Sequence, residues 1–125
     1  MVRKTFMGKI DDDVIRKYRI FNVGERQFDF YLMVLERDFL GLLYATYIGG
    51  SESDGINAAG VNYGDSYRGE IILDANGKVH IASCTSSANF PTSPGAFQTT
   101  LAGAQDGVYL RLNNSLSILE VSTYI

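Results

Sequence analysis

The sequence has very few of the residues that build the common covalent and metal cross-links of small domains. Its 125 residues include one cysteine, one histidine, two prolines and no tryptophan. A single cysteine excludes an internal disulfide and a zinc site built on cysteines. A formal net charge of −3 argues against a surface that neutralises nucleic-acid phosphates. These scarcities exclude several classes of protein without pointing to a function.

Long apolar runs are also missing from the chain. The longest, such as residues 39–44, are far too short for a membrane-spanning helix. Arg3 and Lys4 resemble the charged start of a signal peptide, but Gly8, Lys9 and three aspartates follow before any useful apolar region. We therefore expect no signal peptide in this chain and no membrane insertion. A hydrophobic fraction of 46% predicts a folded domain.

The composition changes along the chain near residue 40. Residues 1–40 contain two of the 13 glycines, whereas residues 41–125 contain the other 11 and both prolines. Short apolar runs separated by glycine, serine, asparagine and aspartate predict an all-β chain with tight turns. Asp13 could cap a short helix, but residues 14–21 are rich in β-branched and aromatic side chains. We favour a strand there.

Two segments of the chain align without a gap at an offset of 77 residues. Residues 29–48 lie over residues 106–125, and apolar character is kept at most positions. Each segment predicts two strands joined by a turn. The identical pairs include Asp29/Asp106, Leu35/Leu112, Thr46/Thr123, Tyr47/Tyr124 and Ile48/Ile125.

A further hairpin is predicted between the two aligned segments. Asn76-Gly77 separates the apolar runs 70–74 and 78–83, and Asn-Gly between such runs is the strongest short-range hairpin signal. Followed by the second aligned segment, it makes four antiparallel strands. That is the content of one propeller blade.

The segment after this hairpin carries a specific motif, Asn89-Phe-Pro-Thr-Ser-Pro-Gly-Ala-Phe-Gln98. The stretches Tyr44-Ala-Thr-Tyr-Ile-Gly-Gly50 and Val121-Ser-Thr-Tyr-Ile125 share a second motif. With these motifs, residues 29–125 resemble the bacterial beta-propeller repeat called SBBP. The resemblance implies antiparallel four-stranded blades of propeller type.

The resemblance is incomplete in three places. Residues 51–68 are longer than the link usual in that family, Cys84 stands where the family has glycine, and residues 1–28 match poorly. About one and a half blades are present, whereas a closed propeller needs four to eight. We expect an incomplete propeller, with a small stand-alone β-sandwich or barrel as the alternative. The expected divisions are a divergent N-terminal segment (1–28), the outer half of a preceding blade (29–50), a Gly/Asp/Ser-rich loop (51–68) and one four-stranded blade (69–125).

Candidate catalytic groups are scarce. His80 is the only histidine, and Cys84 lies four residues further along the same predicted strand. Such residues are about 13 Å apart, too far for a hydrogen bond. We therefore expect neither an enzyme nor a bound cofactor. His80 is predicted to have a structural or exposed role.

Weak calcium candidates lie in the loop at residues 51–68, where Glu52, Asp54 and Asp65 stand among glycines. The adjacent aspartates at residues 11–13 lack the spacing of a calcium loop, and we interpret them as a solvated acidic tip. No glycine-containing stretch has the spacing of a phosphate-binding loop.

The aromatic residues of the aligned motifs are expected to pack between blades. They are Tyr44, Tyr47, Tyr124, Phe90 and Phe97. The two phenylalanines are further expected to hold the proline-containing turn against the sheet, because proline limits its freedom.

These observations favour a non-enzymatic structural or protein-interaction module of a bacterial beta-propeller repeat protein. Its expected partners are other blades, a second copy, or a protein that binds open strand edges. The alternative is a carbohydrate- or small-ligand-binding module that uses the loop at residues 51–68. The resemblance implies an extracellular or cell-envelope location.

Overall fold

The described residues form eight β-strands and no helix. The computed structural model describes residues 5–7, 15–22, 28–57 and 69–125. The strands are β1 (Thr5–Met7), β2 (Ile15–Asn22), β3 (Phe28–Leu35), β4 (Leu42–Ile48), β5 (Glu70–Leu73), β6 (Val79–Thr85), β7 (Asp106–Leu112) and β8 (Leu119–Tyr124). The predicted all-β class is confirmed for this part of the chain.

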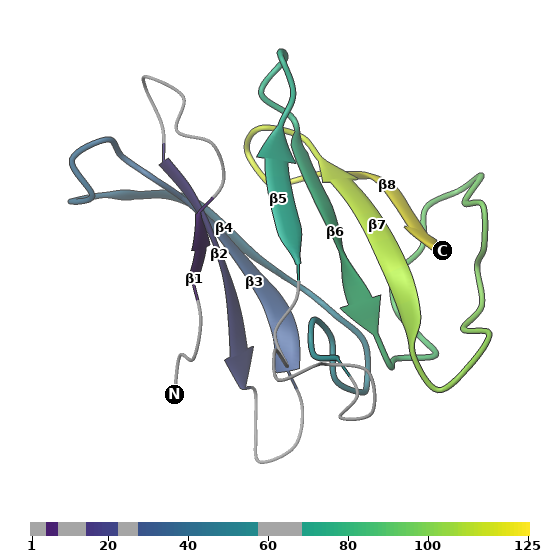
Figure 1. Cartoon of the computed structure of the whole chain (residues 1–125). Helices are drawn as coiled ribbons and strands as arrows, with labels where there is room; N and C mark the ends of the chain where they lie inside the picture. The colour runs from purple at the N-terminus through teal and green to yellow at the C-terminus, as the bar shows by residue number, and fades with distance from the viewer. Residues whose placement is uncertain (1–4, 8–14, 23–27, 58–68) are drawn as a thin grey trace.

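The strands form two antiparallel sheets of four, each in chain order (Figure 1). Sheet 1 has the order β1-β2-β3-β4, and sheet 2 has the order β5-β6-β7-β8. Residues 29–50, expected to be half a sheet, supply β3 and β4, and β2 pairs with β3 along its whole length. Two complete sheets therefore replace the one and a half that we expected. The strand favoured at residues 14–21 is present as β2.

The turn between β5 and β6 has the geometry that Asn-Gly predicts. Gly77 adopts a φ of 76°, in the left-handed region that glycine enters without a steric penalty. Its N–H donates to the carbonyl of Asp74 at 2.9 Å, and the N–H of Asp74 donates to the carbonyl of Lys78 at 3.1 Å. This local hairpin sets the register of the first two strands of sheet 2.

The β3–β4 and β7–β8 hairpins match residue for residue at the offset of 77. Tyr31 pairs with Tyr47 as Val108 pairs with Tyr124, and the two ladders shift register at the same place. The turns also agree: Phe39 has a φ of 63° and Leu116, at the matching position, has a φ of 57°. Each of these N–H groups donates to the carbonyl three residues earlier.

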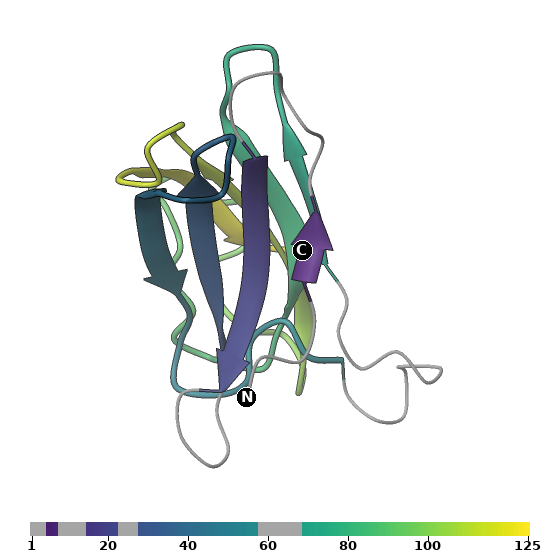
Figure 2. The ribbon, with the colours of Figure 1, turned by 90° about the vertical axis from the view of Figure 1, so that its left-hand side faces the viewer.

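The two sheets pack together through opposite faces of these matching hairpins. In β3 the buried side chains are Phe30, Leu32 and Val34, whereas in β7 they are Val108, Leu110 and Leu112. The 77-residue offset shifts each buried position of β3 by one residue in β7, and successive residues in a strand point to opposite faces. The sheets are thus stacked in the same sense, with β1 next to β5 (Figure 2).

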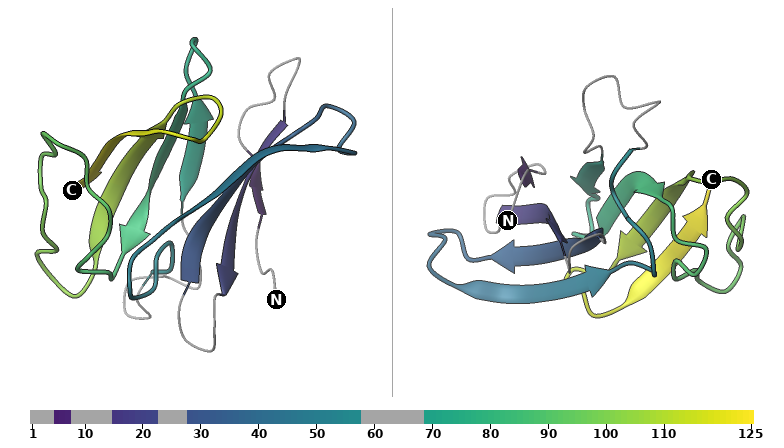
Figure 3. Two further views of the ribbon diagram at one scale, coloured as in Figure 1. Left: turned by 180° about the vertical axis from the view of Figure 1, so that it is seen from behind. Right: turned by 90° about the horizontal axis from the view of Figure 1, so that it is seen from below.

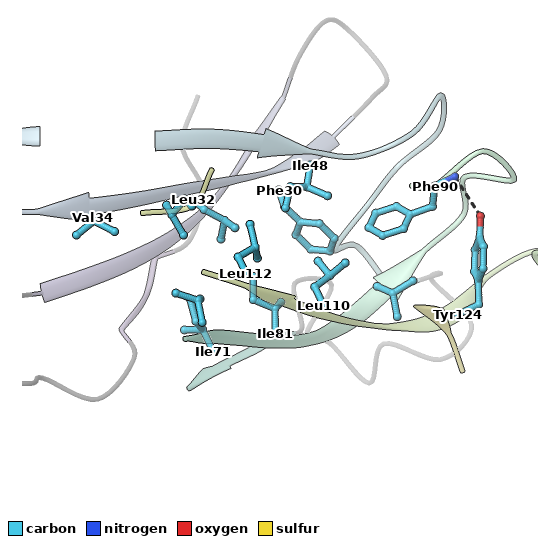
Figure 4. Close-up of a cluster of buried hydrophobic side chains, with 13 residues drawn as sticks. Phe30, Leu32, Val34, Ile48, Ile71, Ile81, Phe90, Leu110, Leu112 and Tyr124 are labelled. Carbon is cyan, nitrogen blue, oxygen red and sulfur yellow. Dashed lines mark hydrogen bonds between the residues drawn. The ribbon is translucent and has the colours of Figure 1, made fainter. Parts of the chain in front are cut away.

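A single core lies between the sheets (Figure 4). Phe90, from the long connection between β6 and β7, inserts between Phe30 of sheet 1 and Tyr124 of sheet 2. Its ring stands edge-on to that of Phe30, with centroids 6.0 Å apart, and to that of Tyr124, at 6.3 Å. Such edge-to-face contacts add about 1 kcal/mol each to the free energy of burial.

The connection between the second and third strands differs greatly between the sheets. In sheet 2 it comprises residues 86–105 and lies along β8, where the N–H of Ser93 donates to the carbonyl of Ser122 and the N–H of Tyr124 to the carbonyl of Gln98. In sheet 1 it comprises only residues 23–27. Within the described ranges, no backbone hydrogen bond joins the free edge of β4 to another segment. Figure 3 shows the long connection beside β8.

Candidate functional site

Asp54, a calcium candidate, is fully buried and its carboxylate is already hydrogen-bonded. The N–H of Gly50 donates to its Oδ2 at 2.7 Å, and the hydroxyl of Thr85 donates to its Oδ1. The N–H of Ser87 donates in turn to the hydroxyl oxygen of Thr85 at 2.9 Å. The carboxylate therefore joins the start of the loop at residues 51–68 to the end of β6.

Burial raises the pKa of Asp54 above the ordinary value of 3.8. The hydrogen bonds from Thr85 and Gly50 act against that rise, and the nearby carboxylate of Asp29 adds to it. Gly49 allows this crowding, because a Cβ placed there would lie 2.6 Å from Oδ2 of Asp54 and closer still to Asp29. The arrangement is a packed structural cluster.

The three calcium candidates are not brought together by the described structure. Glu52 is exposed, and its N–H donates to the hydroxyl of Ser87 at 2.9 Å. Asp65 and the aspartates at 11–13 lie outside the described residues. Among the residues that are described, no group of three His, Cys, Asp or Glu side chains is arranged to hold a metal.

His80 lies in a polar network on the outer face of sheet 2. Its Nδ1 is 2.8 Å from the hydroxyl of Tyr109, and its Nε2 is 3.2 Å from Oδ2 of Asp74. Beside it, Arg111 and Lys78 both pair with Glu120. Hydrogen bonds from the Lys78 and Asn76 backbone and from His80 lower the pKa of Asp74, and Lys78 lowers that of Glu120. This face is polar and internally satisfied.

Cys84 carries a buried thiol, whose hydrogen-bond partner is not His80. It donates to Oδ1 of Asn57 at 3.2 Å and lies beneath an open pocket of about 450 Å³ that is also lined by Asn57, Gly69, Glu70 and Ser83. Burial raises its pKa to about 11. Because the thiolate is the reactive form, this cysteine is poorly suited to nucleophilic chemistry.

We expect Cys84 in the folded protein to resist thiol reagents at neutral pH. Its high pKa leaves little thiolate, and its side chain is shielded. Labelling with a chromogenic disulfide should be slower by about 100-fold or more than in denaturant. A reaction equally fast in both states would contradict the buried placement.

Tyr124 is the aromatic motif residue that the structure buries most completely. Its side chain is 0% exposed. Its hydroxyl donates to the carbonyl of Ser87 at 2.7 Å and accepts the N–H of Phe90 at 3.0 Å. The hydroxyl therefore fixes the start of the long β6–β7 connection against sheet 2 (Figure 4).

Replacing Tyr124 by phenylalanine should lower the free energy of unfolding by about 1–2 kcal/mol, because two buried hydrogen bonds are lost and the N–H of Phe90 and the carbonyl of Ser87 keep only their 3.3 Å bond to each other. Chemical denaturation of both proteins measures the change. Tyr109→Phe is a matched control, because that hydroxyl bonds only on the partly buried outer face. An equal decrease in the free energy of unfolding in the two variants would contradict the role of the Tyr124 hydroxyl in fixing the connection.

The other aromatic motif residues differ in burial. Phe90 packs between the sheets as expected, but Phe97 is 86% exposed and does not hold its turn against the sheet. Tyr44 and Tyr47 are exposed too, and Tyr47 is 60% exposed although its match Tyr124 is buried. These three residues therefore do not pack between the two described sheets, and their packing against a further blade stays a prediction.

A continuous apolar surface surrounds Tyr47. We define the outer apolar face as Tyr31, Met33 and Leu35 of β3 with their register partners in β4, Tyr47, Ala45 and Leu42. The rings of Tyr31 and Tyr47 are in contact, with centroids 4.7 Å apart. No described element lies over this face (Figure 2). The adjoining turn adds the exposed side chains of Phe39 and Leu40. The unbroken apolar run at residues 30–35 of β3 is the sequence signal for a strand with two apolar faces.

In the described part of the chain, no helix is long and apolar enough to cross a membrane. The sequence matches no family model and no curated protein, and the fold matches no solved structure.

Proposed function

We propose that this protein is a non-enzymatic structural module that interacts with another protein through stacked, propeller-type β-sheets. The observation that carries the proposal is the outer apolar face of sheet 1. Exposed apolar patches rimmed by polar residues are typical of protein-binding surfaces. By its resemblance to the SBBP repeat, the protein would work outside the cell or in the cell envelope.

The blade-like character rests on how the two sheets are stacked. The matching hairpins β3–β4 and β7–β8 contact each other through opposite faces, so one sheet follows the other in the same sense. Repeats in an array stack in this way, each covering one face of its neighbour. The four-stranded meander of each sheet is also the content of a propeller blade.

The alternative, a ligand-binding module that uses the loop at residues 51–68, gains no support from residues 51–57. Asp54 is buried and bonded to Thr85 and Gly50, and the N–H groups of Ser51 and Glu52 are bonded to Asn89 and Ser87. This part of the loop serves to fasten the connection between the sheets.

The proposal is tested by asking whether the outer apolar face is available in the folded monomer. The fluorescent apolar dye anilinonaphthalene sulfonate should bind the protein at dilutions where sedimentation shows a monomer. The double variant Leu42→Lys/Tyr47→Lys should lose most of this binding. Phe97→Lys, which changes an equally exposed aromatic residue elsewhere, should keep it. A cooperatively folded monomer that binds no dye would refute the proposed surface.

A further inference from the structure

We infer that the outer apolar face is completed by a second copy of this chain, which binds head to tail through the outer face of its sheet 2. The inference rests on the proposed function and names the partner. In this arrangement sheet 2 of one copy covers sheet 1 of the next, in the same sense in which the two sheets of one chain are stacked.

The first step is the equivalence between the exposed face of sheet 1 and the buried face of sheet 2. At the offset of 77, Tyr31, Met33 and Leu35 correspond to residues of β7 that are at most 1% exposed. In β4, Tyr47, Ala45 and Leu42 correspond to positions of β8 that are buried or half-buried. These corresponding residues are Val108, Leu110, Leu112, Tyr124, Ser122 and Leu119.

The second step identifies what such a face packs against. In sheet 2 the corresponding face is covered by Phe30, Leu32 and Val34 of sheet 1. The residues that match these three at the offset of 77 are Gly107, Tyr109 and Arg111, and they lie on the outer face of sheet 2. Among the described residues, the outer face of sheet 2 is therefore the surface that corresponds to the face of sheet 1 covering sheet 2.

The third step is that the outer face of sheet 2 carries exposed apolar area beside its polar network. Ile72 of β5 is 59% exposed on this face, beside its register partner His80, and Tyr109 presents its ring next to them. Next to them lie Arg111, the register partner of His80, and Lys78, and both pair with Glu120. Because part of this face is charged, we expect association that is weaker than between two wholly apolar faces.

The fourth step concerns closure. A contact between unlike faces leaves a free face at each end, so copies add until the rotation closes a ring. The described residues of two copies contribute four sheets, and closed propellers typically contain four to eight. A symmetrical contact between two apolar faces would instead reverse the sense of stacking that the chain itself uses.

The test uses one variant on each face and then mixes them. Tyr47→Lys changes the outer apolar face, and Ile72→Lys changes the outer face of sheet 2; both side chains are more than half exposed, so the fold should be kept. Phe97→Lys is the control on neither face. Sedimentation velocity from micromolar to millimolar protein should show association for the wild type and the control, weakened by about tenfold or more in each lysine variant.

The mixture decides the geometry. A head-to-tail contact leaves one intact interface between Ile72→Lys and Tyr47→Lys, so the mixed variants should form a heterodimer although neither associates alone. A symmetrical apolar contact would leave Ile72→Lys associating by itself and the mixture without heterodimers, which would overturn the inference. A wild type that stays monomeric while still binding the apolar dye would also overturn it and would leave the proposed function standing. If a lysine variant unfolds, Tyr47→Ser and Ile72→Ser replace the pair.

Discussion

Replacing Phe90 by alanine is expected to lower the free energy of unfolding by about 4 kcal/mol, the usual loss for a buried phenylalanine. Phe90 is 3% exposed and contacts Phe30 of sheet 1 and Tyr124 of sheet 2. Its removal leaves a cavity at the place where the two sheets and the long connection meet. Urea denaturation followed by tyrosine fluorescence measures the change.

Phe97→Ala is the matched control for this experiment. It removes the same side chain from the same connection, but Phe97 is 86% exposed, so its loss should change stability by less than about 0.5 kcal/mol. If both variants lost the same stability, Phe90 would not be the residue that joins the sheets.

Replacing Asp54 by alanine is expected to lower the free energy of unfolding by about 3 kcal/mol at acid pH. The buried hydroxyl of Thr85 and the N–H of Gly50 would both lose their acceptor, and each such loss costs about 1–3 kcal/mol. Glu52→Ala, which removes an exposed carboxylate of the same loop, should have little effect. An Asp54→Ala variant with the same free energy of unfolding as the wild type at pH 4 would contradict this account.

The loss caused by Asp54→Ala should also depend on pH in a defined direction. Burial raises the pKa of Asp54 above 3.8, so the folded protein holds this proton more tightly than the unfolded chain. The protonated carboxyl makes its full contribution to stability at pH values below the ordinary pKa of 3.8. That contribution declines as the pH rises through the raised pKa of Asp54 in the folded protein. The difference between wild type and variant should therefore shrink from acid to neutral pH. A stability difference that grows as the pH rises would contradict the expected direction.

Local signals in the sequence predicted sheet 2 well and sheet 1 poorly. Asn76-Gly77 specifies its turn through backbone conformation alone, so the β5–β6 hairpin could be predicted without knowledge of its neighbours. Residues 1–28 carry no comparable turn or motif, and only pairing with β3 makes β2 part of a four-stranded sheet. Such pairing depends on contacts that periodicity does not report.

The candidate site could be predicted only in part, because identical residues have different surroundings. Tyr47 and Tyr124 occupy the same place in matching hairpins, but the connection at residues 86–105 and sheet 1 bury only Tyr124. A carboxylate among glycines makes Asp54 a calcium candidate by sequence alone. Its burial follows from the bridge that its backbone makes with Thr85, which no local pattern indicates.

The chain order of the strands has a consequence for the rate of folding. Within each sheet the strands pair in chain order, so every ladder except β6–β7, whose connection comprises residues 86–105, closes a short loop and forms at low entropic cost. The contact between Phe30 and Phe90 instead joins residues 60 positions apart. We expect each meander to form early and the stacking of the sheets to come late. Weakening that stacking should then chiefly accelerate unfolding, with refolding almost unchanged.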